Sequence, residues 1–128
     1  MRFLLDTHTL LWWFSNDPAL SDAVREAIAM PENEPIVSSV CAWEIATKKR
    51  IGKLPHAGDL LTDFGALVRQ ARFSTLPISV DHALSAGALP WPHRDPFDRM
   101  LVAQGQIEDL PIATTDADIS GYGITCIW

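Results

Sequence analysis

Short apolar runs alternate along this chain with longer segments that have the periodicity of amphipathic helices. The pattern predicts strands at residues 2–6, 36–38, 73–78, 111–114 and 124–128, and helices at residues 9–14, 21–30, 39–50, 60–71, 80–88 and 95–108. Alternation with short connections favours a parallel sheet covered by helices on both faces. The expected fold is an α/β domain of three layers, with a central, mostly parallel sheet of about five short strands flanked by helices.

Composition is typical of one globular domain. The 128 residues form a single predicted domain, 1–128, with 48% hydrophobic and 20% charged residues. A formal charge of -6 argues against general electrostatic binding to nucleic acid or to an anionic membrane, so any nucleic-acid contact is local. We expect a cytoplasmic protein, because no apolar run is long enough to span a membrane and Cys41 and Cys126 have no metal-ligand spacing.

The first predicted strand runs directly into a carboxylate, Asp6, at the edge of the sheet where α/β proteins bind their ligands. Two roles are open for Asp6: it caps the helix that follows, or it binds a cation. Asp116 follows the strand at residues 111–114 in the same way. The nearby Asp118 and Gly121 also fit a simple turn there.

Glu44 and Asp98 are acidic residues on helix faces that are otherwise apolar. Glu44 needs a partner if it is buried, and Lys48, one helical turn later, is a candidate. Asp98 is either part of a site or a first-turn acid favoured by the helix dipole. Asp95 is followed by Pro96, a pattern typical of a helix N-cap.

All four acids fall at the carboxyl end of a predicted strand or on a helix that leaves that end. In a parallel sheet these ends meet at one edge, where carboxylates repel one another unless a divalent cation neutralises them. An oxygen-only ligand set without a His or Cys cluster favours Mg²⁺ or Mn²⁺ over zinc. Such a site suits hydrolysis of a phosphodiester, because the metal neutralises phosphate oxygens and activates a bound water.

Several stretches together resemble the PIN-domain ribonucleases, and in particular the VapC-type toxins of bacterial toxin-antitoxin pairs. They are LLDTH at 4–8, SSVCAWEIATK at 38–48 with GKL at 52–54, DPFDRMLVAQ at 95–104 and IATTD at 112–116. The resemblance spans almost the whole chain and keeps the family's order and size. It departs from the family pattern Ser-x-x-Ser-x-x-Glu at one position, where Cys41 replaces the second serine.

The resemblance implies a set of catalytic residues that also bind Mg²⁺ or Mn²⁺, namely Asp6, Glu44, Asp98 and, as the most variable fourth acid, Asp116. Residues expected to support the site or to position substrate are Thr7, Thr115, Asp95 and Arg99. Basic residues expected to contact RNA phosphates are Lys48, Lys49, Arg50, Lys53 and Arg94. A solvated helix end stabilised by the dipole is the alternative for the lysine and arginine cluster.

The resemblance also implies partners. An RNA substrate, single-stranded or structured and often transfer RNA, is cut to leave 5′-phosphate and 3′-hydroxyl ends. The family forms homodimers and binds a small antitoxin whose tail occupies the groove. Trp12, Trp13 and Phe14 fit contact with another chain, because adjacent helical residues cannot all face one core. Packing within their own core is the alternative.

Two other classes of function compete with a nuclease. A phosphoacceptor or phosphatase domain also places an aspartate after its first strand. The dehalogenase-type signature needs a second aspartate two positions later, where this chain has His8, and a receiver domain needs an acid pair. The third hypothesis is a non-catalytic binding partner with the same fold. The full set of acids argues against it.

Overall fold

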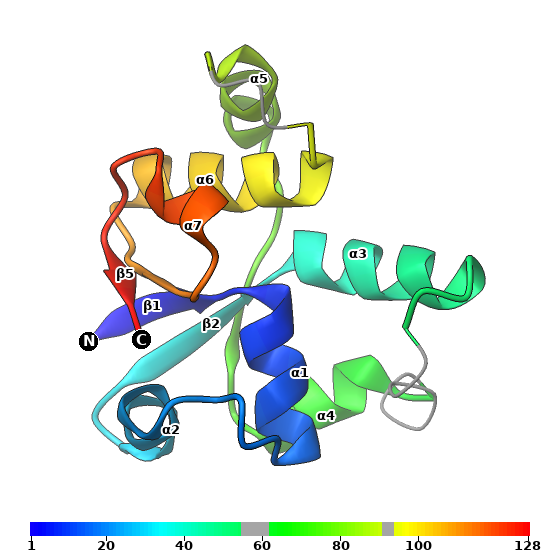
Figure 1. Cartoon of the computed structure of the whole chain (residues 1–128), viewed down its shortest axis with the longest axis vertical. Coiled ribbons are helices and arrows are strands. Elements are labelled where there is room, and N and C mark those ends of the chain that lie inside the picture. Colours follow the sequence, from blue (N-terminus) through cyan, green and yellow to red (C-terminus); the bar gives the residue numbers. More distant parts are fainter. Residues whose placement is uncertain (55–61, 91–93) are drawn as a thin grey trace.

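A five-stranded parallel sheet forms the centre of the molecule. The computed structural model describes residues 1–54, 62–90 and 94–128. The strands are β1 (Arg2–Leu5), β2 (Glu34–Ser38), β3 (Ser74–Leu76), β4 (Ile112–Ala113) and β5 (Cys126–Ile127). Their order in the sheet is β3-β2-β1-β4-β5, and every neighbouring pair is parallel (Figure 1). The α/β fold expected from the sequence is confirmed.

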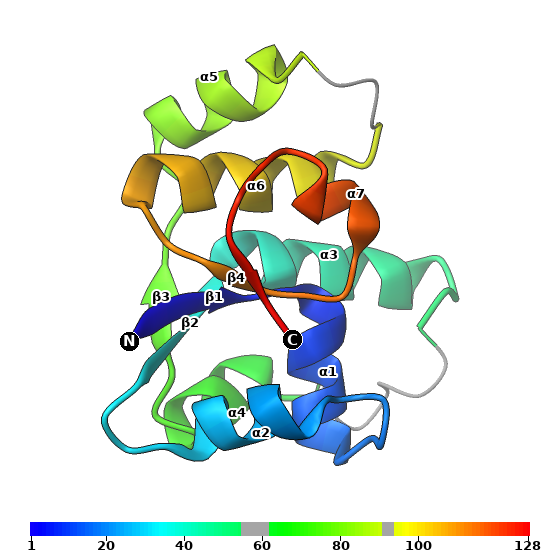
Figure 2. The same ribbon diagram turned by 60° about the vertical axis from the view of Figure 1, so that its left-hand side comes forward.

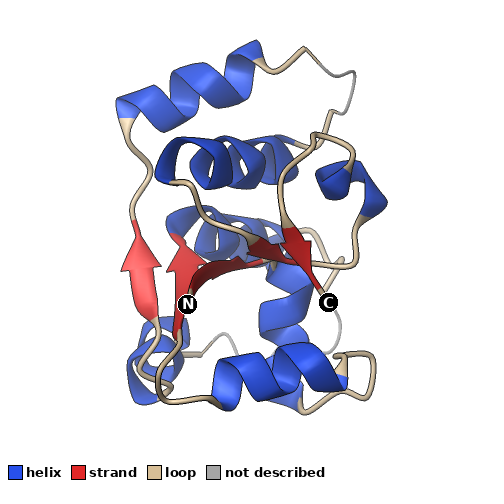
Figure 3. Cartoon of the chain, turned by 90° about the vertical axis from the view of Figure 1, so that its left-hand side faces the viewer, coloured by secondary structure: helices blue, strands red, loops and turns tan. Residues whose placement is uncertain are grey.

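Helices cover both sides of this sheet. They are α1 (Thr7–Ser15), α2 (Asp22–Ala29), α3 (Ser39–Arg50), α4 (Phe64–Gln70), α5 (Val80–Ala88), α6 (Pro96–Glu108) and α7 (Ala117–Ser120). Helices α1, α2 and α4 lie on one side, and α5, α6 and α7 lie on the other (Figures 2 and 3). Helix α3 leaves the end of β2 and extends beyond the sheet (Figure 1). None of the helices in the described part of the chain has the length and apolar character needed to cross a membrane.

Polar caps decide where the helices begin. Helices α3 and α5 have the predicted bounds, because Ser38 and Ser79 each accept a hydrogen bond from the first turn. Helix α1 begins at Thr7, two residues earlier than predicted, because Asp6 is its cap. Helix α4 begins later than predicted, after its cap Asp63. The first residues of that predicted helix, 60 and 61, lie outside the described residues, and the short α7 was not predicted from the sequence.

The strand order creates a switch point at the centre of the sheet. From β1 the chain proceeds to β2 and β3 on one side, and it later places β4 and β5 on the other side. Phe3, Leu4 and Leu5 of β1 are fully buried, as expected of a central strand covered on both faces. Parallel sheets of this type bind ligands beyond the carboxyl ends of the strands at the switch point. That position lies between the ends of β1 and β4.

Helix α6 packs closely against the segment before β5, and Gly105 is the point of closest approach. A Cβ atom at Gly105 would lie 2.3 Å from Ile124 Cδ1 and 3.1 Å from the Leu110 carbonyl oxygen. We expect Gly105→Ala to lower the free energy of unfolding by about 1–3 kcal/mol, because Ile124 has to move out of a packed position. Urea denaturation followed by circular dichroism measures this change.

Gly87 provides the matched control for this substitution. It lies in α5, and a Cβ atom there would have no neighbour within 4 Å. We expect Gly87→Ala to raise the free energy of unfolding by up to about 1 kcal/mol, since alanine is the better helix former. Wild-type stability in Gly105→Ala would show that the contact with Ile124 relaxes without cost.

Candidate active site

The register of β1 and β4 brings Asp6 beside Thr114. Leu5 pairs with Ala113, so Asp6 and Thr114 are the next residues along the two strands. The Asp6 amide donates to the Ala113 carbonyl oxygen at 3.2 Å, and Thr114 Oγ1 donates to Asp6 Oδ2 at 2.7 Å. The other carboxylate oxygen, Oδ1, accepts from the Thr7 amide at 2.7 Å. Asp6 is thus the cap of α1 and also lies at the switch point.

Burial makes the charge of Asp6 costly. Only 5% of the residue is exposed, and burial raises the pKa of its carboxyl group above the ordinary value. The hydrogen bonds from Thr114 and Thr7 and the charge of His8 oppose this rise in pKa, whereas the charge of Glu44 adds to it. A cation near Asp6 would favour the ionised carboxylate.

Glu44 reaches the same place from the middle of α3. Its Oε1 atom accepts a hydrogen bond from Thr7 Oγ1 at 2.6 Å, and its Oε2 atom pairs with Lys48 Nζ. The residue is only 4% exposed. Thr7 therefore links the two acids directly: its amide binds Asp6 and its hydroxyl binds Glu44.

Asp98 and Asp95 come from the first turn of α6. Asp98 is buried, with 9% of its surface exposed. Asp95 Oδ1 accepts hydrogen bonds from the amides of Phe97 at 2.9 Å and Asp98 at 3.3 Å. Asp95 is therefore the cap of α6, the alternative that the sequence left open, and its charge also acts on the neighbouring site.

Lys48 supplies positive charge to this group of acids. Burial lowers the pKa of its ammonium group, but the hydrogen bond and charge of Glu44 and the charges of Asp95 and Asp98 outweigh burial. The net result is a pKa above the ordinary lysine value. The Lys48 side chain is 26% exposed, so its ammonium lies at the mouth of the site. In this arrangement the Lys48 ammonium neutralises part of the negative charge of Glu44, Asp95 and Asp98.

The acids have the donor chemistry for a divalent metal ion. Asp6, Glu44 and Asp98 offer buried carboxylate oxygens, which Mg²⁺ and Mn²⁺ prefer. Within residues 1–54, 62–90 and 94–128, no group of three or more His, Cys, Asp or Glu side chains is close enough together to hold a metal ion in this arrangement. Lys48 provides the counter-charge here. The residues fit a divalent ion by type and burial, whereas in this arrangement the Lys48 ammonium occupies Glu44 Oε2.

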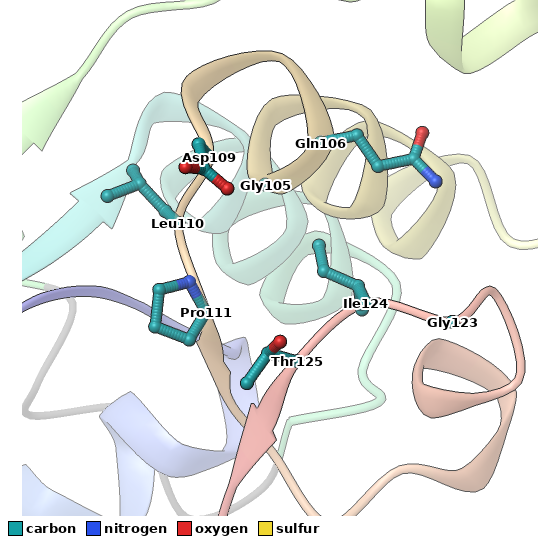
Figure 4. Close-up of a pocket in the computed structure, with 8 residues that line it drawn as sticks. All are labelled: Gly105, Gln106, Asp109, Leu110, Pro111, Gly123, Ile124 and Thr125. Carbon is teal, nitrogen blue, oxygen red and sulfur yellow. The ribbon is translucent and has the colours of Figure 1, made fainter.

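A separate hollow lies at the opposite end of the sheet, before β4 and β5 (Figure 4). The residues that line it are Gly105, Gln106, Asp109, Leu110, Pro111, Gly123, Ile124 and Thr125. Among these eight, Asp109 has the one titratable side chain, and its backbone ends α6 in the left-handed conformation. The chemistry-bearing side chains are instead gathered at the carboxyl end of the sheet.

Comparison with known families agrees with this architecture. The family model described as PIN domain matches residues 3–124. The chain belongs to the PIN domain family. A curated relative, Ribonuclease VapC16 of Mycobacterium tuberculosis, is 39% identical over an alignment 72 residues long that covers 52% of this chain and 48% of that protein. The match thus spans about half the length of this relative.

Solved structures share the PIN fold of this chain at low sequence identity. VapBC2 from Rickettsia felis, bound to a DNA fragment from its promoter, gives a TM-score of 0.71 at 12% identity over 99% of this chain and 98% of that one. A toxin-antitoxin complex from Klebsiella pneumoniae gives 0.65 at 19% identity over 98% and 96%. VapBC-1 from nontypeable Haemophilus influenzae gives 0.66 at 15% identity over 99% and 97%. These likenesses establish the fold.

Asp116 lies at the edge of the site in this PIN domain. Its Oδ1 atom accepts from the Asp118 amide at 2.8 Å and caps α7. Its own amide donates to Thr114 Oγ1 at 3.0 Å, and that hydroxyl donates to Asp6. The turn expected around Asp118 is thus present as a short helix, and Thr114 connects the backbone of Asp116 to Asp6.

Thr114 is a site residue that the sequence analysis missed. We expected Thr115 to assist by hydrogen bonding, but Thr115 is exposed and Thr114 is the residue that binds Asp6. The difference follows from the register, since parallel pairing of β1 with β4 places position 114 opposite position 6. The strand order would have revealed this pair, but the sequence pattern alone does not give that order.

Arg99 binds the carboxyl end of α5, and its expected role in positioning substrate stays a prediction. Its Nε atom donates to the Ala86 carbonyl oxygen at 3.0 Å. Its Nη2 atom donates to the carbonyl oxygens of Gly87 at 3.2 Å and Leu89 at 2.8 Å. These carbonyls belong to the end of α5, which has no further helical turn to satisfy them. Arg99 therefore ties α5 to α6, whereas Arg94 is exposed.

The basic cluster at the end of α3 divides into two parts. Lys48 pairs with Glu44, whereas Lys49, Arg50 and Lys53 are exposed and available to solvent.

Cys41, at the position of the family serine, is fully buried, and its Sγ atom lies 3.5 Å from the Leu5 carbonyl oxygen. Burial raises the pKa of the Cys41 thiol to about 12, so it remains neutral and packs as a small side chain.

The aromatic residues of α1 make contacts within the chain and remain partly exposed. Trp13 and Phe14 both pack against Phe73, with ring centroids 6.4 Å and 6.0 Å apart. Trp12 packs against Trp128 at 5.8 Å. Trp12, Trp13 and Phe14 therefore pack within their own chain, which is one of the two roles that the sequence left open for them. Contact with another chain stays a prediction.

Proposed function

We propose that this PIN domain is a metal-dependent endoribonuclease and the toxin of a type II toxin-antitoxin pair. The observation that carries the proposal is the convergence of Asp6 and Glu44, both buried, on Thr7 at the switch point of the sheet. Asp98 adds a third buried carboxylate whose charge acts on Lys48. The mycobacterial relative is a ribonuclease by name and the Klebsiella pneumoniae neighbour is a toxin-antitoxin complex, and both support the same function.

In this proposal Asp6, Glu44 and Asp98 hold Mg²⁺ or Mn²⁺, with Asp116 at the edge of the site. The ion, when bound, supplies positive charge for the phosphate oxygens and lowers the pKa of a water molecule. Thr7 and Thr114 fix the orientation of the carboxylates by the hydrogen bonds described above. Correctly oriented ligands bind a metal more tightly, because less order has to be imposed on binding.

The exposed surface supports the substrate and the partners that the family membership suggests. Lys49, Arg50, Lys53 and Arg94 are exposed and provide local phosphate contacts on a chain whose formal charge is -6. We propose transfer RNA in the cytoplasm as the first substrate to test. A cognate antitoxin and a second copy of the chain are the proposed protein partners. The partly exposed rings of Trp12, Trp13 and Phe14 offer apolar surface for such contacts.

Cleavage of total RNA with added Mg²⁺, compared with the same reaction in EDTA, tests the proposed function. We expect discrete products with Mg²⁺ or Mn²⁺ and intact RNA in EDTA, and end mapping should find 5′-phosphate and 3′-hydroxyl termini. Cleavage that persists in EDTA would contradict a metal-dependent mechanism. No cleavage under any metal, together with tight binding of a partner protein, would favour the non-catalytic function instead.

A further inference from the structure

A large exposed aromatic side chain precedes the buried Glu44 on α3. Trp43 of α3 has 53% of its surface exposed, far more than the buried Glu44 that follows it. Its ring packs edge-on against Phe97 of α6, with centroids 4.7 Å apart and an interplanar angle of 72°. This contact holds one side of the indole in place, because edge-to-face pairs are favourable at this distance. The rest of the ring is open to solvent.

The aromatic pair joins the two helices that carry the proposed metal ligands. Trp43 directly precedes Glu44, and Phe97 directly precedes Asp98. Arg50 lies seven residues after Trp43, on the same stripe of α3, and it is exposed. The outer surface of α3 therefore presents an exposed aromatic ring at position 43 and a cation about two helical turns farther along.

We propose that Trp43 stacks on a nucleotide base next to the phosphodiester that is cut, so that the RNA is unpaired at the cut. This inference rests on the proposed ribonuclease function and names the form of its substrate. Stacking on an aromatic ring requires a base that is splayed out of a helix, because bases within an A-form duplex are not accessible. Arg50 contacts the phosphate backbone on the same side.

The surroundings of Trp43 favour a nucleotide over a protein side chain as its partner. Trp43 precedes Glu44 in α3 and packs on Phe97, which precedes Asp98 in α6, and α3 also carries exposed cations, so a strand bound along α3 would bring a base to the ring and phosphates to these cations. A protein contact at Trp43 would not require an unpaired base. It is therefore a distinct outcome of the tests below.

Fluorescence quenching tests the stacking contact without relying on cleavage. Asp98→Asn is titrated in Mg²⁺ with a short single-stranded RNA, and the double variant Asp98→Asn with Trp43→Phe is titrated in parallel. The chain has five tryptophans, so the difference between the two titrations reports Trp43. We expect quenching that is lost in the double variant and weak for the same RNA in a duplex. Equal quenching in both proteins would overturn the proposal.

Abasic substrates then locate the stacked base. Trp43→Ala is expected to lower kcat/KM on unpaired RNA by roughly 5- to 100-fold, the range for loss of one base–aromatic stack. Removing the base beside the cut should cause a similar loss in wild type and little further loss in Trp43→Ala, because both changes remove one contact. Trp43→Phe should retain most of the activity. If Trp43→Ala and removal of the base together lower kcat/KM by the product of their separate effects, Trp43 does not touch that base.

Met30→Ala is the matched control for loss of exposed apolar surface. Met30 follows α2 and is 49% exposed, and we expect its substitution to leave cleavage and quenching unchanged. If Trp43→Ala leaves RNA cleavage unchanged but weakens binding of a protein partner, Trp43 is a protein contact and the proposal is wrong. If wild type cuts no RNA but shows Trp43-dependent quenching, the proposed function fails and the stacking site stands.

Discussion

Asp6→Asn, Glu44→Gln and Asp98→Asn are each expected to lower Mg²⁺-dependent RNA cleavage by about a thousandfold or more. Each substitution keeps the size and shape of the side chain but removes the negative charge that a divalent ion requires. The fold should persist, because Thr7 can still donate hydrogen bonds to the amide oxygen at position 6 or 44. Single-turnover kinetics on a mapped RNA site measure the loss, and circular dichroism checks the fold.

Two further substitutions make this prediction specific to the site. Asp116→Asn should reduce cleavage less than Asp6→Asn, because Asp116 lies at the edge and its carboxylate caps α7. Asp109→Asn is the matched control at the far end of the sheet, where asparagine tolerates the left-handed backbone and activity should be unchanged. Undiminished cleavage by Asp98→Asn would count decisively against the proposed metal site.

Lys48→Met is expected to lower the free energy of unfolding by about 2–3 kcal/mol when divalent ions are removed. The substitution leaves the buried carboxylate of Glu44 without the ammonium that pairs with it. The expected value is below the range for a fully buried pair, because Lys48 is 26% exposed and solvent screens part of its charge. Thermal and urea denaturation in EDTA measure the loss.

Mg²⁺ should restore stability to Lys48→Met more strongly than it stabilises wild type. In wild type the metal competes with the Lys48 ammonium for Glu44, whereas in the variant the metal meets a free carboxylate. Melting temperatures across a Mg²⁺ titration measure this difference. An equal rise in both proteins would show that the metal and Lys48 do not share Glu44.

Two control variants separate the pairing of Lys48 from its size and general charge. Lys49→Met removes an exposed neighbouring lysine and should change stability by no more than about 0.5 kcal/mol. Lys48→Met combined with Glu44→Gln removes both charges, and it should regain much of the stability lost in the single variant.

Local sequence signals predicted most of the fold because the caps are encoded next to the helices that they begin. Ser38 and Asp95 define the starts of α3 and α6, and the structure confirms both positions. Prediction failed where a different local signal decided the outcome. Asp63 caps α4 after the apolar pattern has already started, and Asp116 caps the four-residue α7, which is too short to show a periodic pattern.

The candidate site could be predicted as a set of acids but not as a set of contacts. Burial of Asp6, Glu44 and Asp98 follows from their apolar surroundings, which are visible in the sequence. The pairing of Thr114 with Asp6 depends on β4 lying beside β1, and a strand of two residues carries no signal of its neighbour. The binding of Arg99 to α5 likewise depends on how two helices pack.

The carboxyl edge of the sheet draws on distant parts of the chain, with Asp6 and Thr114 separated by 108 positions in the sequence. Contacts between such distant residues form slowly during folding, since a long loop has to close before the strands pair. On the ribosome, β4 emerges long after β1 and β2. A nascent chain therefore carries Asp6 and Glu44 well before Thr114 is present to bind Asp6, and docking of β4 completes this arrangement.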